Sequence, residues 1–165
     1  MIYFVLLRPI SRELNLLATF LRLVGIAIEA IATLSLVTAL FPLGNTAYLK
    51  AFTREQLHAM AYLAIRSHAN GYALALLFFG FTFLFHGYLI SKSGYLPKAL
   101  GILIQVAGVG YLTNSLALYL APGFQARIFP AILIPAFVAE ASLCLWLLLK
   151  GVNLEKWRAA VIVRT

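Results

Sequence analysis

Two apolar runs of membrane-spanning length stand next to each other in residues 70–119, NGYALALLFFGFTFLFHGYLI-SKSGYLPK-ALGILIQVAGVGYLTNSLALY. Neither run, 70–90 or 99–119, contains a Lys, Arg, Asp or Glu residue. A helix needs about 20 mostly apolar residues to cross the hydrocarbon core of a bilayer, and each run has that length. Because the basic connector between them is so short, the two helices are predicted to be antiparallel neighbours.

The composition of the whole chain agrees with a membrane protein. Of its 165 residues, 63% are hydrophobic and 11% are charged, whereas soluble domains have about 25% charged residues. The net charge of +8 does not indicate nucleic-acid binding, because the thirteen Lys and Arg residues are scattered in short segments between apolar runs. That distribution is typical of chains that contact a lipid bilayer. The single Cys144 lies inside an apolar run, where we expect a buried, inert thiol.

We therefore predict an all-α integral membrane bundle, a single domain over residues 1–165, with four antiparallel spanning helices. The spans are expected at about 17–41, 68–90, 98–120 and 129–149. Pro42 and Gly44 end the first span, and Pro97 suits the first helical position of the third. An apolar stub at 1–7 is too short to span the bilayer, and the amphipathic segment 154–161 predicts a short helix lying on the membrane surface.

The segment before the second span begins with Thr53-Arg54-Glu55-Gln56, which predicts a capping box and therefore a helix start. The polar stretch 67–71 then leaves two alternatives open. Either the chain kinks there, or one long helix runs straight through to residue 90.

The distribution of basic residues predicts the orientation. If both termini and the connector 91–98 share one side, that side has nine basic residues and the other has four. The nine are Arg8, Arg12, Arg22, Lys92, Lys98, Lys150, Lys156, Arg158 and Arg164, and the four are Lys50, Arg54, Arg66 and Arg127. Because Lys and Arg are enriched in cytoplasmic segments, both termini are predicted to lie in the cytoplasm.

Several motifs resemble the bacterial membrane proteins grouped as domain of unknown function 4386. They are LLRP (6–9), RLVG (22–25), FFG (78–80), HGYLI (86–90), SGYLPKALG (93–101), GYL (110–112), Glu140, LWLL (145–148) and KGV (150–152). The resemblance covers nearly the whole chain and implies a multi-pass protein of the bacterial inner membrane. Since the family members compared have about six spans, it also implies that this chain begins partway into the second. It implies no established activity.

Charged side chains inside a bilayer are costly, so each one indicates a partner or a function. Glu29 and Glu140 are expected near the middle of the first and fourth spans, at similar depth. They could share a proton or cation between two helices, or each could simply link helices by hydrogen bonds. Arg22 lies on the same face as Glu29 and is expected either to extend to the membrane interface or to form an ion pair with Glu29.

Other polar residues in the spans are weaker candidates. His86 and Asn114 could contact a ligand, although a histidine with satisfied hydrogen bonds and an amide linking two helices are the simpler interpretations. The spacing of the histidines fits no metal site, and no cofactor is expected. Gly101, Gly108 and Ser115 recur every seven residues, which predicts a face where another helix approaches closely.

Three functions are compatible with this sequence. The first is a non-enzymatic protein that binds or passes a small ligand, ion or proton, using Glu29, Glu140, His86, Asn114 and Arg22. The second is a structural or partner-binding subunit, paired with a second copy of itself or with another membrane protein. The third, an intramembrane enzyme, is disfavoured because no acid, base and nucleophile set is evident.

The predicted orientation can be tested by thiol labelling. Single cysteines at Ser93 and Thr46, in a Cys144→Ser background, are treated with a membrane-impermeant maleimide on intact cells. We expect labelling at position 46 and none at 93, because 93 lies in the basic connector assigned to the cytoplasm. The reverse pattern would invert the orientation.

Overall fold

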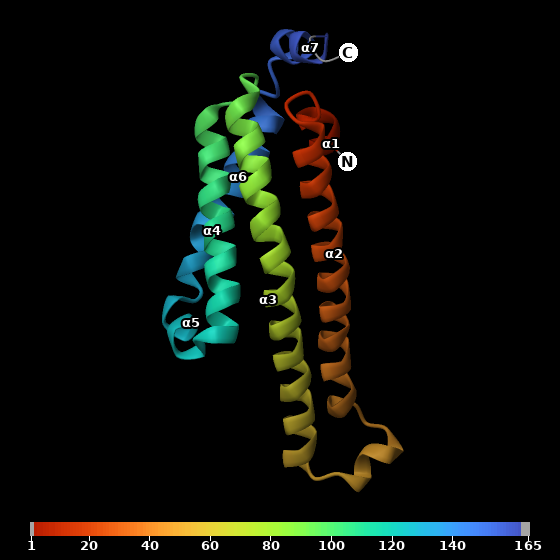
Figure 1. Ribbon diagram of the computed structural model, residues 1–165. Coiled ribbons are helices and arrows are strands. Elements are labelled where there is room, and N and C mark those ends of the chain that lie inside the picture. The colour runs from red at the N-terminus through yellow and green to blue at the C-terminus, as the bar shows by residue number, and fades with distance from the viewer. Residues whose placement is uncertain (1, 163–165) are drawn as a thin grey trace.

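The computed structural model describes residues 2–162, in which all regular secondary structure is helical (Figure 1). The α-helices are α1 (Ile2–Leu7), α2 (Arg12–Leu40), α3 (Arg54–Ser93), α4 (Lys98–Leu120), α5 (Pro122–Ile128), α6 (Ile134–Leu149) and α7 (Leu154–Ile162). Short 3-10 turns lie at Phe41–Leu43, Ala47–Ala51 and Ala131–Leu133. Within the described range, four helical segments are long and apolar enough to cross a membrane: Arg12–Leu43, Arg54–Ser93, Lys98–Leu120 and Ala131–Leu149. The predicted all-α membrane bundle is confirmed.

Local capping signals explain where the first two long helices begin. Ser11 accepts a hydrogen bond from the Leu14 amide through its side chain, so α2 starts at Arg12, earlier than the span predicted from hydrophobicity. Thr53 and Gln56 form the predicted capping box at the start of α3. From there α3 runs without interruption to Ser93, so the straight-helix alternative holds and 67–71 is not a break. Gly94, with φ of 70°, ends the helix.

The third and fourth spans differ in how well their limits were predicted. Helix α4 covers 98–120 as expected, although Pro97 is its capping residue and not its first helical residue. The α-helical part of the fourth span begins only at Ile134, five residues later than predicted, after the turn Ala131–Leu133. Pro135 accounts for the difference, because a helix that began at 129 would need a hydrogen bond from residue 135, and proline has no N–H. In the first turn of α6 the missing N–H is tolerated. The short helix α5 was not predicted.

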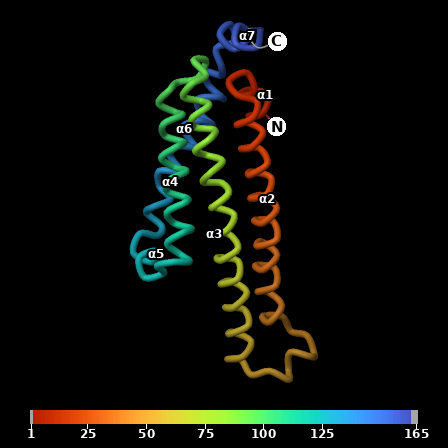
Figure 2. The backbone as a smooth tube through the Cα atoms, in the orientation of Figure 1, coloured from red at the N-terminus to blue at the C-terminus, as the bar shows by residue number. Residues whose placement is uncertain are grey.

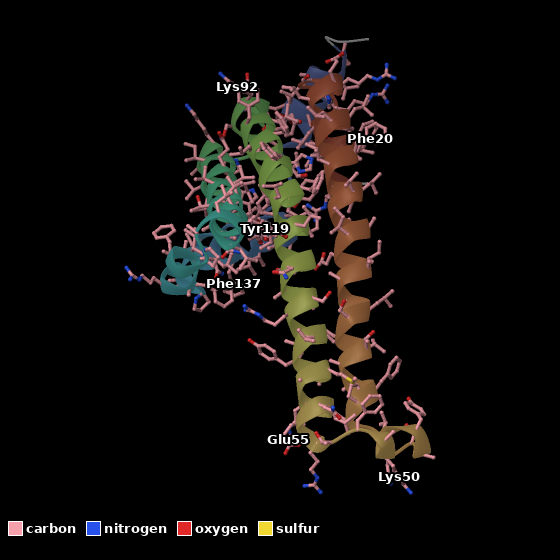
Figure 3. The ribbon with its side chains drawn as sticks, turned by 60° about the horizontal axis from the view of Figure 1, so that its bottom comes forward. Phe20, Lys50, Glu55, Lys92, Tyr119 and Phe137 are labelled. Atoms are coloured by element: carbon pink, nitrogen blue, oxygen red, sulfur yellow. The ribbon has the colours of Figure 1, made fainter. Side chains whose placement is uncertain are left out.

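The helices pack as an ordered series in which α2 lies along α3, α3 lies against α4, and α4 lies against α6 (Figures 1 and 2). Helices α1 and α7 lie together at one end of the bundle, which is also the end of the α3–α4 connector. Figure 3 shows Lys92 at this end and Lys50 and Glu55 at the opposite end. The two ends of the described chain are therefore on the same side, as an even number of spans requires.

Hydrogen bonds to one carbonyl hold this end of the bundle together. The Tyr95 hydroxyl donates to the Leu6 carbonyl at 2.6 Å, and the Trp157 indole N–H donates to the same oxygen at 3.2 Å. The Asn153 amide in turn donates to the Tyr95 carbonyl at 3.2 Å. Burial raises the pKa of Tyr95 to about 12, so its hydroxyl keeps its proton and remains a donor at neutral pH. These bonds join α1, the α3–α4 connector and the start of α7.

Glycines allow α3 and α4 to approach each other at backbone distance. A Cβ atom added at Gly101 would lie 2.5 Å from the Gly87 carbonyl oxygen, and one added at Gly108 would lie 2.8 Å from the Gly80 carbonyl oxygen. Both distances are shorter than van der Waals contact, so a side chain at either position must separate the helices. Ser115, the third residue of the predicted face, is fully buried and donates to the Tyr111 carbonyl.

We expect Gly108→Leu to lower the thermal stability of the purified protein strongly, because the side chain would collide with the backbone of α3. Gly123→Leu is the matched control, since nothing lies within 4 Å of a Cβ atom built at Gly123. The measurement is the unfolding midpoint of both variants in detergent. Equal destabilisation by the two changes would show that the close helix approach is not what stabilises the bundle.

Candidate functional site

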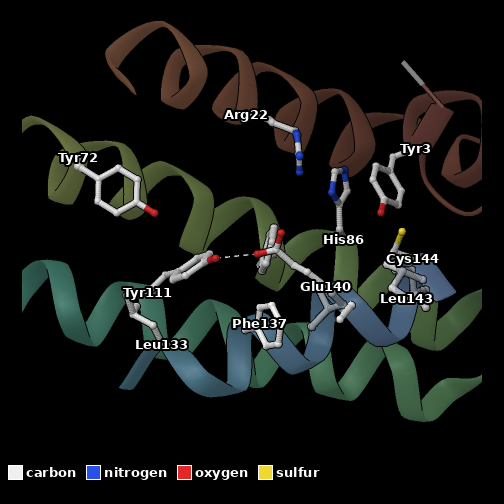
Figure 4. Close-up of a pocket in the computed structure, with 14 residues that line it drawn as sticks. Tyr3, Arg22, Tyr72, His86, Tyr111, Leu133, Phe137, Glu140, Leu143 and Cys144 are labelled. Carbon is white, nitrogen blue, oxygen red and sulfur yellow. Dashed lines mark hydrogen bonds between the residues drawn. The ribbon is translucent and has the colours of Figure 1, made fainter. Parts of the chain in front are cut away.

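A cavity of about 580 Å³ lies between α2 and α6, with α3 and α4 at its base. Its walls combine apolar side chains, among them Phe83, Ile104 and Phe137, with an unusual number of polar ones for a membrane-embedded location. The residues that carry a polar group are Tyr3, Arg22, Tyr72, His86, Tyr111, Glu140 and Cys144 (Figure 4). Since α2 packs on α3 and α6 packs on α4, the cavity occupies the space left between the two outer helices.

A short hydrogen bond connects α4 to α6 on one side of this cavity. The Tyr111 hydroxyl of α4 donates to Glu140 Oε1 of α6 at 2.6 Å (Figure 4). The Tyr111 ring also lies against Phe83 of α3, with ring centroids 5.3 Å apart. The aromatic contact fixes the ring, and the hydroxyl then fixes one oxygen of the carboxylate. The second oxygen of Glu140 makes no hydrogen bond within residues 2–162 and is left to accept one in the cavity.

Arg22 enters the cavity from α2. Its guanidinium lies over the ring of Tyr3 at 6.0 Å from the centroid, a cation–π arrangement. In the described part of the chain it forms neither a hydrogen bond nor an ion pair, so the predicted alternative of an ion pair with Glu29 is wrong. Figure 4 shows the Arg22 side chain pointing from α2 toward the part of the cavity that contains His86 and Glu140. All of its N–H donors are therefore available to a bound molecule.

His86 lies deep in the same cavity. Its side chain is only 4% exposed and stacks on Tyr3, with ring centroids 5.3 Å apart. Its Nε2 atom has no hydrogen-bond partner among residues 2–162. The expectation of a histidine with satisfied hydrogen bonds therefore fails here, whereas His68 meets it through a contact of 3.1 Å between Nδ1 and the Ala32 carbonyl oxygen. A buried polar atom without a partner costs about 1–3 kcal/mol, and a ligand in the cavity would remove that cost.

The cavity brings together three of the five predicted ligand-binding residues, namely Arg22, His86 and Glu140. Asn114 is buried elsewhere, where its side-chain oxygen accepts a hydrogen bond from Gln125 at 3.1 Å and joins α4 to α5. Glu29 does not line the cavity. It is half-buried. A proton or cation shared between Glu29 and Glu140 stays a prediction.

Four polar lining residues were not predicted: Tyr3, Tyr72, Tyr111 and Cys144. The Cys144 prediction was wrong, because the thiol is exposed and lies at the cavity wall where the gap between α2 and α6 leaves α6 uncovered. Tyr111 could have been found, since a tyrosine and a glutamate near the middle of adjacent spans are natural hydrogen-bond partners. Tyr3 could not, because the stub that carries it has no periodic pattern.

The donor set of the cavity is unsuited to a bound metal ion. Nowhere in residues 2–162 do three or more His, Cys, Asp or Glu side chains come together. The cavity combines one imidazole, one carboxylate and one thiol with a guanidinium, and a guanidinium repels cations. The arrangement favours a molecule that presents both acceptor and donor groups.

A protein-family model matches most of the chain. The family model described as "Domain of unknown function (DUF4386)" matches residues 1–151, which contain all four spans and every residue of the cavity. No curated protein matches the chain, and no solved structure does.

A double-mutant cycle can measure the Tyr111–Glu140 bond. We expect Tyr111→Phe and Glu140→Gln to be non-additive, with a coupling free energy of about 0.5–3 kcal/mol in the free energy of unfolding, because the two groups touch. Tyr119→Phe is the matched control, since its hydroxyl donates to the Asn70 carbonyl at the same 2.6 Å distance but has no contact with Glu140. Full additivity for both tyrosines would mean that the bond does not persist in the membrane.

Proposed function

The chain belongs to the family of the domain of unknown function DUF4386, which names no activity, so we propose its function from the cavity: binding of a small amphipathic molecule within the membrane. On this proposal, Arg22 and His86 hold an acceptor or anionic group of the ligand, and Glu140 accepts a hydrogen bond from a donor group. The single observation that carries the proposal is the unpartnered Nε2 of a histidine that is only 4% exposed.

The two polar sides of the cavity support a ligand of mixed character. A guanidinium in a low-dielectric setting attracts a carboxylate or phosphate strongly, and Arg22 has no acidic partner in residues 2–162. The Tyr111-bound carboxylate of Glu140 is an acceptor facing it across the cavity. The apolar lining, including Phe137 and Leu143, suits a hydrocarbon portion. Binding is favoured over catalysis because no nucleophile is hydrogen-bonded to a base in this set.

We also propose that the protein lies in a bacterial inner membrane with both termini in the cytoplasm. Four candidate spans support an integral membrane location. The end that carries α1, α7 and the α3–α4 connector is the end rich in Lys and Arg, and basic residues favour the cytoplasmic side.

Cys144 provides a native reporter for the binding test, since it is the only cysteine and lies at the cavity wall. The measurement is the rate of its alkylation by N-ethylmaleimide in nanodiscs, with decanoate, decanol or decylammonium added below micellar concentration. We expect decanoate to slow alkylation most, because its carboxylate can bind Arg22 and His86. Arg22→Gln should remove this protection.

Arg66→Gln is the matched control, because Arg66 makes the same kind of contact, with Tyr62 at 5.9 Å, outside the cavity. It should leave the protection by decanoate unchanged. Equal protection by all three amphiphiles would indicate unspecific partition into the bilayer. Protection that survives Arg22→Gln would contradict the assigned role of the guanidinium.

A second candidate function is a subunit that binds another membrane protein or a second copy of itself. The observation in its favour is the length of α3, whose 40 residues correspond to about 60 Å, twice the hydrocarbon thickness of about 30 Å. The α2–α3 hairpin extends past the end of α4 and α6 and carries exposed apolar residues, including Leu34, Leu40 and Leu63. Native mass spectrometry that finds one copy per nanodisc and no other protein would count against this candidate.

A further inference from the structure

Two cavities lie side by side at the end of the bundle where α1 and α7 meet, apart from the cavity described above. The first, of about 590 Å³, has Arg8 and Arg12 in its wall. The second, of about 410 Å³, has only apolar side chains in its wall, which are Ile2, Val5, Leu6, Val152, Leu154 and Trp157. Val5 and Trp157 belong to both. A basic compartment and an apolar compartment are therefore adjacent, separated by the same two side chains.

The wall between the compartments is fixed in place. The Trp157 indole N–H donates to the Leu6 carbonyl at 3.2 Å, and the backbone of Trp157 is held by its own N–H bond to the Asn153 carbonyl at 3.0 Å. The indole therefore cannot swing away without breaking a partly buried hydrogen bond. Tryptophan is enriched where apolar and polar regions of a bilayer meet, so its position also places these cavities at the interface.

The two arginines are arranged to bind an anion. Arg8 follows the end of α1 and Arg12 is the first residue of α2, and both side chains are exposed. Neither guanidinium takes part in a hydrogen bond or ring contact within residues 2–162, whereas Lys92 and Lys150 at the same end lie over the rings of Tyr88 and Trp146. Guanidinium groups bind phosphate through paired hydrogen bonds.

Glu13 also lines the basic compartment, and the Ser11 hydroxyl donates to its Oε2 at 3.2 Å. Among the described side chains in its wall, two guanidinium groups and one carboxylate give a net charge of +1. The compartment therefore attracts a monovalent anion and gives no such advantage to a zwitterion.

We propose that the two cavities form one site for an anionic phospholipid, with the phosphate between Arg8 and Arg12 and an acyl chain in the apolar compartment. The division of the site into a basic and an apolar part matches a lipid, whose two parts are covalently joined. A free phosphate would fill only the first compartment. The proposal is independent of the ligand assigned to the cavity between α2 and α6.

The site would also connect the lipid, through α1, to the cavity between α2 and α6. Val5 of this short helix lines both the basic and the apolar compartment. Tyr3, two residues away, lines the cavity between α2 and α6 and stacks on His86. A lipid that holds α1 against α7 would thereby hold Tyr3 in place.

The test compares full-length wild type with Arg8→Gln/Arg12→Gln and with Lys50→Gln/Arg54→Gln, the matched control at the opposite end of the bundle. Native mass spectrometry from detergent measures retention of added phosphatidylglycerol and phosphatidylcholine. We expect wild type and control to retain phosphatidylglycerol preferentially. The Arg8/Arg12 variant should lose this preference about tenfold or more, since each basic residue adds to anionic-lipid affinity.

Two further measurements distinguish a phospholipid site from a site for a free anion. Inorganic phosphate at the same concentration should leave the thermal unfolding midpoint unchanged, while phosphatidylglycerol should raise it; equal shifts would mean an anion site and overturn the lipid assignment. Leu154→Gln should weaken lipid retention without changing the charge. If Arg8→Gln/Arg12→Gln does not fold, Arg8→Lys/Arg12→Lys keeps the charge and should retain part of the preference. Unchanged retention in all these variants would overturn the proposal.

Discussion

The backbone contact between α3 and α4 determines where the polar residues of this protein can meet. Gly80 and Gly87 on α3 face Gly108 and Gly101 on α4, and the distances leave no room for a side chain at Gly101 or Gly108. In a bilayer no hydrophobic force drives helices together, so close packing of this kind supplies much of the association energy. It also sets the base of the cavity between α2 and α6, because His86 directly precedes Gly87 on α3 and Tyr111 follows Gly108 by three residues on α4.

The outer helices depend on this central pair. Helix α2 packs on α3 and helix α6 packs on α4, so neither closes the space between them. Arg22 and Glu140 enter that space from opposite outer helices, and the two inner helices supply His86 and Tyr111. Opposite charges on the two sides of a low-dielectric cavity act more strongly than they would in water. If the cavity binds a ligand as proposed, we expect a molecule with complementary groups at matching positions to bind more tightly than one with a single charge.

The sequence predicted the architecture well because hydrophobic length and short connectors are local properties. The capping box at Thr53 and the limits of α4 were likewise readable from adjacent residues. The delayed start of α6 was not, because a proline can either open a helix or prevent it, and Pro135 is accommodated only in the first turn of a helix that starts at 134. Of the site, Arg22, His86 and Glu140 were predicted as isolated polar residues. Their assembly depends on helix rotation, which sequence spacing alone does not fix, and this is also why Asn114 faces Gln125 instead.

The role of α1 follows from the bonds that hold it. It has only six residues, too few to be stable as an isolated helix. Its Leu6 carbonyl accepts hydrogen bonds from Tyr95 and Trp157, and its Phe4 carbonyl accepts one from the Asn15 side chain at 2.7 Å. Three separate parts of the chain therefore determine the position of Tyr3, and with it the ring on which both Arg22 and His86 rest. We therefore expect a change at the α1–α7 end to alter the position of Tyr3 in the cavity between α2 and α6.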